Sequence, residues 1–352
     1  MIELLSEHVA NQIAAGEVIQ RPASAVKELL ENAIDAQSTK VQLIVKDAGA
    51  SLVQVIDNGM GMTKEDAEIC FKKHATSKIK NTNDLFSISS KGFRGEALSS
   101  IAAVSQVELK TKKIESDIGH QVKIEASKVV SSEPCAFSNG TSISMRNLFF
   151  NVPARRNFLK SKGVETKHII DEFHRVALTH PEIHFTMHHN NNVVFDLPIT
   201  NTRQRIVSIF GKKYNERLVP VDEETSITKI SGFVLKPEFS KRTRGEQFLF
   251  INNRFIRNNS INHAIKVVFK DLIGNDSYPS YFIYLTVPLD SIDVNIHPSK
   301  TEIKFEDERA VYELVKSSVR SSLSRNNIAP SIDFNPETSF DFPPLKLSLI
   351  HI

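Results

Sequence analysis

The apolar residues between positions 26 and 36 recur with the period of an α-helix. They stand at i, i+3, i+4 and i+7, which is the spacing of an amphipathic helix. These residues are Val26, Leu29, Leu30 and Ala33. A second face of the helix carries Glu28, Asn32 and Asp35 within about 60° of arc, at roughly 100° per residue. A solvated polar face is one interpretation of this pattern, and a binding site is the other.

Two features of the sequence favour a binding site on this helix. The polar face has acidic and amide side chains but almost no Lys or Arg. A strand-like run over 51–56 then ends directly at Asp57, the first residue of the glycine-broken segment DNGMGM (57–62). An acid that can activate water, an amide that can hold a metal ion and a glycine loop together indicate a site that handles phosphate.

A long polar segment with two glycines follows. A helix is predicted over 64–73, then comes HATSKI (74–79), and then GFRGEAL (92–98) at the start of an apolar helix. Backbone N–H groups at a glycine-rich helix start, with Lys78 and Arg94 nearby, suit a polyphosphate. Glycines before helices are common, so this motif alone leaves a purely structural role open. Its length and glycine hinges make the segment 71–97 a candidate lid.

The remaining pattern predicts one unit up to about residue 200 and a second one after it. An early helical pattern ends near Gly16, and Ser24 is the expected N-cap of the helix that carries Glu28. In the first unit, strands are predicted at 40–46, 107–111, 119–124, 141–146, 184–188 and 192–196, with a helix at 166–178. In the second unit, strands are predicted at 228–235, 247–251 and 281–287, a strand–turn–strand segment at 293–305, and helices at 203–210, 260–272 and 308–323. We therefore predict domains over 1–200 and 201–326, followed by the start of a disordered linker over 327–352.

Composition narrows the class of protein. The chain has 352 residues, of which 40% are hydrophobic, and this is enough for two domains with sizeable cores. Its two cysteines, Cys70 and Cys135, lack metal-ligand spacing and are expected to be reduced core residues of a cytosolic protein. The sequence has no apolar run of about 18 residues and no signal-peptide pattern, so we expect neither a membrane span nor secretion.

Positive charge is clustered rather than large. The net charge of +3 is too small to indicate a nucleic-acid partner by itself. The segment 236–257, however, contains six Lys or Arg residues and two Glu residues, a local charge of +4. The segment 147–162 ends in Arg155, Arg156, Lys160 and Lys162 with no acid among them. Such clusters suit a phosphate backbone, and a solvated face is the alternative interpretation.

Four motifs resemble the ATP-binding motifs of the GHKL superfamily, which includes gyrase-type topoisomerases, heat-shock chaperone ATPases and histidine kinases. They are ELLENAIDA (28–36), DNGMGM (57–62), GFRGEAL (92–98) and Gly140-Thr141. Four further motifs resemble the MutL family of DNA mismatch-repair proteins within that superfamily. They are NQIAAGEV (11–18), HATSKI (74–79), PARRNFLK (153–160) and NIHPSK (295–300). The motifs occur in the family's order, so the resemblance covers almost the whole chain.

The resemblance implies an α+β fold with two parts. The first is a GHKL (Bergerat-type) α/β sandwich with a mainly antiparallel sheet, and the second is a smaller ribosomal-protein-like β/α domain. ATP and Mg²⁺ are the implied cofactors. By resemblance, Glu28 is the general base that activates the attacking water, Asn32 coordinates Mg²⁺, and Lys300 reaches the γ-phosphate from the second domain. We expect Asp35 to support the site without contacting the nucleotide.

The other nucleotide contacts also follow from the resemblance. Asp57 accepts a hydrogen bond from the adenine amino group, Gly61 lets the backbone come close to the base, and Thr141 supports the adenine end. Met62 belongs to the same nucleotide-binding set. The implied lid and phosphate cradle contain Thr76, Ser77, Lys78, Gly92, Phe93, Arg94, Gly95, Ala97 and Leu98.

The implied activity is a slow, switch-like ATPase that pairs with a second copy on binding ATP and closes around DNA. We expect DNA contacts without sequence specificity, at Arg155, Arg156, Lys160, Arg254 and Arg257. The resemblance further implies a MutS-type mismatch-recognition partner, a downstream endonuclease or helicase, and a bacterial cytoplasmic, nucleoid-associated location. No DQHA-type motif or Cys/His cluster occurs in the chain, so no endonuclease site is assigned to it. Two alternatives stay open: a topoisomerase-type GHKL ATPase subunit, and a DNA-binding scaffold that does not hydrolyse ATP.

Overall fold

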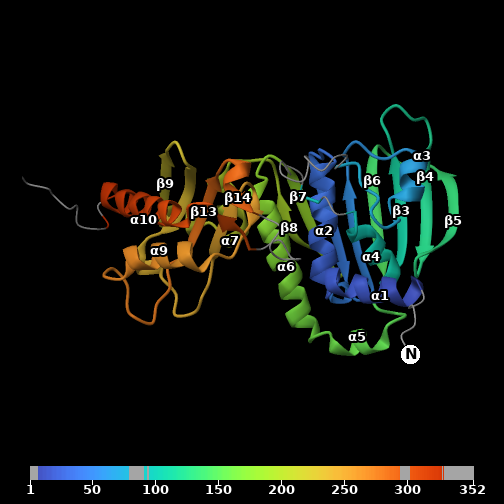
Figure 1. The fold of residues 1–352 in the computed structure, drawn as a ribbon, viewed down its shortest axis with the longest axis horizontal. Helices are drawn as coiled ribbons and strands as arrows, with labels where there is room; N and C mark the ends of the chain where they lie inside the picture. The colour runs from blue at the N-terminus through green and yellow to red at the C-terminus, as the bar shows by residue number, and fades with distance from the viewer. Residues whose placement is uncertain (1–6, 79–90, 93–94, 294–301, 327, 329–352) are drawn as a thin grey trace, which may run out of the picture.

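The computed structural model describes residues 7–78, 91–92, 95–293, 302–326 and 328. Within these residues, two large sheets lie side by side along the long axis of the molecule, each with helices packed against it (Figure 1). The first sheet is built from residues 40–197 and the second from residues 218–286. Three predicted site residues, Phe93, Arg94 and Lys300, lie outside the described residues.

The first sheet has eight strands in the described part of the chain. They are β1 (Lys40–Lys46), β2 (Leu52–Asp57), β3 (Gln106–Lys112), β4 (Gly119–Glu125), β5 (Lys128–Cys135), β6 (Gly140–Arg146), β7 (His184–His189) and β8 (Asn192–Leu197). Their order across the sheet is β5–β4–β3–β6–β2–β1–β7–β8. Only β1 and β7 pair in parallel, so the mainly antiparallel sheet predicted from the sequence is confirmed.

Helices α2, α4 and α6 cover one face of this sheet, and α1 packs against α4 (Figure 1). The helices of this unit are α1 (Glu7–Val18), α2 (Pro22–Asp35), α3 (Lys64–Ile69), α4 (Ala97–Val104), α5 (Pro153–Phe158) and α6 (Lys162–Thr179), with a 3₁₀ turn η1 (Asp47–Gly49). Alternate residues of β1, namely Val41, Leu43 and Val45, are buried beneath them. The apolar core of the first unit therefore lies between the sheet and its helices.

Helix α2 begins at Pro22 and buries the apolar stripe that the sequence predicts. Proline suits the first helical position because its fixed φ is helical and its missing N–H needs no partner there. The predicted N-cap was wrong: Ser24 lies inside the helix, and the extended residue Arg21 precedes it. The stripe consists of Val26, Leu29, Leu30 and Ala33, all buried. Burial of each Val or Leu side chain contributes about 1.5–3 kcal/mol, which fixes α2 on the sheet with its polar face partly exposed.

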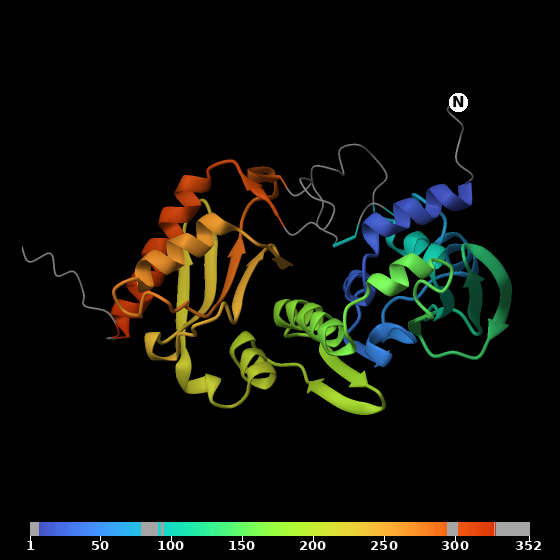
Figure 2. The ribbon, with the colours of Figure 1, turned by 90° about the horizontal axis from the view of Figure 1, so that it is seen from below.

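The second unit is a smaller sheet with two long helices on one face. Its strands are β9 (Leu218–Glu224), β10 (Lys229–Leu235), β11 (Gln247–Ile251), β12 (Arg254–Phe255) and β13 (Tyr281–Thr286), in the order β12–β11–β13–β10–β9. Its helices are α7 (Thr202–Phe210), α8 (Tyr214–Arg217), α9 (Asn259–Phe269) and α10 (Glu308–Arg325), and the remaining short elements are η3 (Pro237–Phe239), η4 (Leu289–Ser291), β14 (Ile292–Asp293) and β15 (Lys304–Phe305). Figure 2 shows α9 and α10 packed beside each other on the sheet.

An apolar cluster and a buried arginine join the two units. The cluster contains Leu178 of α6, Ile206 of α7 and Phe282 of β13 among its buried members. The guanidinium group of Arg205 is fully buried and donates hydrogen bonds to three carbonyl oxygens, those of Pro181, Ile183 and Pro198. The predicted domain boundary at 200/201 falls between β8 and α7, and it stays a prediction.

Several elements differ from the sequence-based expectation. Strand β5 was not predicted because, at the edge of the sheet, it is exposed on both faces and shows no alternation. Strand β9 was not predicted because it contains Pro220, which an edge strand tolerates. The first helix continues past Gly16 to Val18, and the helix from Lys64 ends at Ile69 rather than near residue 73. None of the described helices combines the length and apolar composition that a membrane crossing requires.

Candidate nucleotide-binding site

A partly buried carboxyl group stands at the end of the central strand β2. The carboxylate of Asp57 accepts hydrogen bonds from the amide of Gly59, at 2.8 Å, and from the hydroxyl of Ser38, at 3.2 Å. Burial raises the pKa of Asp57 to about 6, although these hydrogen bonds and one from the backbone of Thr141 oppose the shift. Because the carboxylate form prevails near neutral pH, Asp57 is a fixed acceptor for a ligand that carries an N–H group.

The glycine loop after Asp57 is held between the end of α2 and the end of β3. The amide of Met60 donates to the carbonyl of Ala36, and the amide of Met62 donates to the hydroxyl of Thr111 at 2.9 Å. Gly61 has a φ of +66°, and a Cβ atom there would lie 2.2 Å from the carbonyl oxygen of Lys112. Only glycine fits this position, so the chain can pass closely over β3 beside Asp57.

Thr141 lies directly beside Asp57 in the sheet. The two residues are paired across β2 and β6, and the Thr141 hydroxyl lies 3.0 Å from that of Thr111. The Thr111 hydroxyl also donates to the carbonyl of Gly140. Three neighbouring strands therefore converge on the predicted adenine end of the site, and hydroxyl groups fix their mutual position.

The polar face of α2 lies against the glycine segment that precedes α4. Asp35 accepts hydrogen bonds from the amides of Lys91 and Gly92, each at 3.1 Å, and its Oδ2 atom lies 2.5 Å from the ammonium group of Lys78. The same ammonium group donates to the side-chain oxygen of Asn32 at 3.2 Å. Glu28 lies one helical turn before Asn32 and is half-buried. Asp35 thus holds the backbone of the predicted cradle, and its supporting role in nucleotide binding stays a prediction.

The described part of the candidate lid is tied to the glycine segment by backbone contacts. The amide of His74 donates to the carbonyl of Gly95, and the hydroxyl of Thr76 accepts from the amide of Lys78. A Cβ atom on Gly95, whose φ is +62°, would lie 2.6 Å from the carbonyl oxygen of Ala75. Thr76 and Ser77 are exposed, while Ala97 and Leu98 form the first turn of α4. The structure therefore brings both lid motifs to one end of α2.

Models of two protein families match successive parts of the chain. Residues 20–147 match the histidine kinase-, DNA gyrase B- and HSP90-like ATPase family. Residues 206–324 match the family described as DNA mismatch repair protein, C-terminal domain. The chain is 59% identical over 343 residues to the DNA mismatch repair protein MutL of Christiangramia forsetii. The chain belongs to the MutL family of DNA mismatch-repair proteins.

A second relative is also a MutL protein, and the two matches show how much of a MutL protein the chain spans. It is 57% identical to MutL of Flavobacterium johnsoniae, and the matched part is 97% of this chain and 53% of that protein. The match to the Christiangramia forsetii protein likewise covers 97% of this chain and 56% of the relative. The chain therefore spans about half the length of the curated MutL proteins that it matches.

Solved structures confirm the fold. The MutL ATPase domain of Aquifex aeolicus, complexed with ADP, superimposes with a TM-score of 0.62 at 25% identity, over 85% of this chain and 98% of that chain. The N-terminal domain of a DNA repair protein superimposes with a TM-score of 0.78 at 25% identity, over 91% of this chain and 99% of that chain. The chain therefore has the GHKL fold expected of a MutL ATPase region, including an ATPase-type domain.

The residues on α2 fit the needs of a magnesium ion at the candidate nucleotide site. Asn32 offers a hard oxygen ligand, and this oxygen already accepts from a cation, the Lys78 ammonium group. A Cβ atom on Gly92 would lie 3.6 Å from the same oxygen, so the cradle backbone is adjacent. The described residues contain no group of three or more His, Cys, Asp or Glu side chains that suits a metal. Magnesium bound partly by phosphate oxygens needs few protein ligands, so Asn32 suffices as a candidate.

The basic residues predicted to contact DNA are not equivalent in the structure. The guanidinium group of Arg155 packs onto Gly16 of α1, where a Cβ atom would lie 1.3 Å from it. Arg254 donates to the carbonyl of Lys91 at 3.2 Å and so contacts the first unit. Arg156, Lys160 and Arg257 are exposed. The exposed residues are therefore the better candidates for DNA contact.

Sequence reasoning missed three residues that shape the site. Thr111 is buried at the end of an otherwise apolar alternation in β3, and a polar residue at such a position is a detectable signal. Ser38 follows α2 and bonds Asp57, with no signal in the local sequence. Lys91 precedes the glycine cradle and is buried, although a lysine at that place looks like an ordinary surface residue.

Proposed function

We propose that this chain is the ATP-binding and ATP-hydrolysing part of a MutL protein that acts in DNA mismatch repair. The observation that carries the proposal is that three elements lie along the polar face of α2 and at its C-terminal end. These are the Asp57 carboxylate with its glycine loop, the Glu28–Asn32 face of the helix, and the Gly92 amide held by Asp35. The first suits adenine, the second suits water and a cation, and the third suits phosphate.

The chain's own groups divide the chemistry. Asp57 accepts from the adenine amino group and selects the base, while Thr141 and Thr111 hold the strands that shape this end. Glu28 orients and deprotonates the attacking water as general base. Asn32 would hold Mg²⁺, which when bound neutralises phosphate charge. Lys78 and the backbone around Gly92 face the phosphates, and Lys300 of the second unit serves as the γ-phosphate sensor.

We further propose that ATP binding makes two copies of the chain pair and close around DNA, and that hydrolysis reopens the pair. Exposed basic residues, Arg156, Lys160 and Arg257, contact the DNA backbone without sequence specificity. In this function a MutS-type protein passes on the recognition of a mismatch, and a downstream endonuclease or helicase acts after it. The role of the chain is that of a nucleotide-controlled connector between them.

Size-exclusion chromatography with light scattering tests this function. The chain is run with Mg²⁺ and a non-hydrolysable ATP analogue, with Mg²⁺ and ADP, and without nucleotide. We expect twice the monomer mass with the analogue only, because only a triphosphate presents a γ-phosphate to the second unit. A monomer in all three runs, despite measured binding of the analogue, would overturn the proposed ATP-driven pairing.

A further inference from the structure

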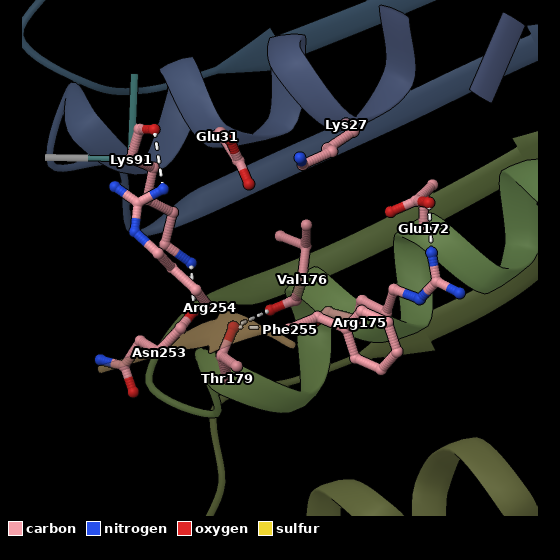
Figure 3. Close-up of a pocket in the computed structure, with 10 residues that line it drawn as sticks. All are labelled: Lys27, Glu31, Lys91, Glu172, Arg175, Val176, Thr179, Asn253, Arg254 and Phe255. Carbon is pink, nitrogen blue, oxygen red and sulfur yellow. Dashed lines mark hydrogen bonds and ion pairs between the residues drawn. The ribbon is translucent and has the colours of Figure 1, made fainter. Parts of the chain in front are cut away.

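A small polar pocket lies where helices α2 and α6 of the first unit meet the turn between β11 and β12 (Figure 3). Glu31 points into it from α2, and Lys91, Asn253 and Arg254 meet at one side. The pocket is separate from the predicted nucleotide contacts, none of which lines it. It is, however, lined by the residue that immediately precedes Gly92 of the phosphate cradle.

Lys91 contacts α2 through its backbone amide and the second unit through its ammonium and carbonyl groups. Its amide N–H donates to Asp35 on α2 at 3.1 Å. Its ammonium group donates to the carbonyl oxygen of Asn253 at 3.1 Å, and its own carbonyl accepts from the guanidinium group of Arg254 at 3.2 Å. Figure 3 shows both contacts with the β11–β12 turn. Lys91 is only 8% exposed, so these hydrogen bonds are shielded from water.

The β11–β12 turn, which accepts these contacts, is itself held in place by hydrogen bonds. Asn252 and Asn253 both have positive φ, at 46° and 62°, as a tight two-residue hairpin turn requires. The Asn252 side chain donates to the carbonyl of Val287 and accepts from its amide, each at 3.0 Å. Phe255 of β12 lies 4.1 Å beneath the guanidinium group of Arg175 on α6. The Asn252 contacts thus fix the turn to the second sheet, so the turn moves with that sheet, while Phe255 adds a contact with α6 of the first unit.

The charged groups around Lys91 affect the pKa of its ammonium group. Burial of the ammonium group lowers the pKa of Lys91, and the nearby guanidinium group of Arg254 lowers it further, whereas the acids Glu31, Asp35 and Glu182 raise it. Burial prevails and lowers the pKa of Lys91 to about 8. Both the ammonium and the amine form have an N–H group to donate, so the bond to the Asn253 carbonyl persists through this titration.

We propose that Lys91 is a positioning residue that couples the phosphate cradle to the second unit through the β11–β12 turn. The Gly92 amide and the Lys91 amide share one carboxylate, that of Asp35, so a shift of the cradle toward phosphate moves Lys91 with it. The two contacts with Asn253 and Arg254 then carry this shift to β11. The inference rests on the proposed ATPase function, since it assigns phosphate binding to the Gly92 segment.

Turnover and nucleotide affinity separate this role from a merely structural one. Lys91→Met keeps the length of the side chain but removes its donor, and we expect kcat for ATP to fall about tenfold while the Kd for ADP changes less than about threefold. Lys91→Arg restores a donor and should recover most of the turnover. Arg254→Met breaks the contact with the Lys91 carbonyl and should also lower kcat. Lys270→Met, which replaces an exposed lysine, is the control for loss of charge.

A tryptophan reporter measures the coupling directly, because the natural chain has no tryptophan. In Phe255→Trp, the single tryptophan lies on β12 beside the pocket, and we expect its emission to shift when a non-hydrolysable ATP analogue is added. Adding Lys91→Met or Arg254→Met should abolish the shift while the analogue still binds. A reporter at Tyr312 on α10 controls for changes in the second unit that do not involve the turn.

The outcomes distinguish this inference from the proposed function. The coupling through Lys91 is overturned if the Phe255→Trp chain binds the analogue without a shift of its tryptophan emission. It is also overturned if the emission shifts equally in that chain and in the chains that add Lys91→Met or Arg254→Met. In either case the ATPase proposal stands. If the wild-type chain binds no nucleotide, the proposed function itself fails. Urea unfolding of each variant verifies that it is folded, and Arg254→Met serves as the test if Lys91→Met does not fold.

Discussion

The side-chain ammonium group of Lys78 lies 3.2 Å from the amide oxygen of Asn32, the same atom that we assign to magnesium. It also lies 2.5 Å from the carboxylate of Asp35. Lys78 thus supplies positive charge at the place where the proposed cation and the negatively charged phosphates would bind. We expect the ammonium group to turn from Asn32 to a phosphate oxygen when a nucleotide binds.

Lys78→Met should therefore weaken phosphate recognition and leave adenine recognition unchanged. A charge-assisted hydrogen bond contributes roughly 1.5–3 kcal/mol, so we expect the affinity for ADP to fall about 10- to 100-fold. Adenosine is the internal control because it has no phosphate. Isothermal titration calorimetry of both ligands makes the comparison, and equal losses for ADP and adenosine would contradict the assignment.

The pKa of Asp57 predicts how adenine binding depends on pH. Because burial raises this pKa to about 6, the folded chain loses stability from this group as pH rises through about 6. Adenine affinity depends on pH in the opposite direction and increases as pH rises, since the ionised carboxylate is the better acceptor. We expect adenosine affinity to be constant above pH 7 and to fall about tenfold by pH 5.

Competition binding with adenosine, which does not titrate between pH 5 and pH 8, measures this dependence. Asp57→Asn removes the titrating group and serves as the control. Its adenosine affinity should be low and independent of pH. A wild-type affinity that is the same at pH 5 and pH 7.5 would show that Asp57 does not accept from the base.

Two glycine substitutions compare a constrained position with a free one. Gly61→Ala places a Cβ atom 2.2 Å from a carbonyl oxygen in a backbone with φ of +66°, so we expect the free energy of unfolding to fall by more than about 2 kcal/mol. A Cβ atom on Gly163, in the first turn of α6, would have no neighbouring atom within 4 Å. Gly163→Ala should be neutral or stabilise by up to about 1 kcal/mol. Urea unfolding measures both, and similar values would refute the close approach at Gly61.

Exposed basic residues on α5 and after it should account for part of the salt dependence of DNA binding. Arg156 and Lys160 are exposed, whereas Arg155 packs onto α1. Replacing both exposed residues by Gln should lower the slope of log affinity against log salt by about 1.8, because each phosphate contact contributes about 0.9. Fluorescence anisotropy with duplex DNA gives the slope. Lys123→Gln on β4 is the control, and a double variant that behaves like it would remove α5 from the DNA interface.

Local patterns were sufficient to predict the two ends of the site. The helical period places Glu28 and Asn32 on one face, and the glycine loop directly follows the strand that ends at Asp57. These features depend on residues that are close in sequence, so periodicity and turn chemistry reveal them. The resemblance to a known family then supplied the order of the motifs and the fold, and the comparisons confirmed the family and the fold.

Contacts between distant residues were beyond sequence reasoning. The bond from the Lys91 amide to Asp35 joins residues 56 positions apart, and that from the Lys91 side chain to Asn253 joins residues 162 apart. Neither has a local signal, because the partners are a backbone carbonyl and a carboxylate that is already part of a helix face. The packing of Arg155 onto Gly16 was hidden for the same reason, since a basic run is equally consistent with solvent.

The rate of ATP hydrolysis by wild-type chain and by Glu28→Ala tests the central claim most directly. Both are purified identically and assayed with Mg²⁺, and ADP binding to each is measured in parallel. The account predicts that the variant loses about 100-fold or more of the turnover while binding ADP within about threefold of wild type, because Glu28 acts on water and not on the nucleotide. Equal hydrolysis rates for the two proteins would contradict the account.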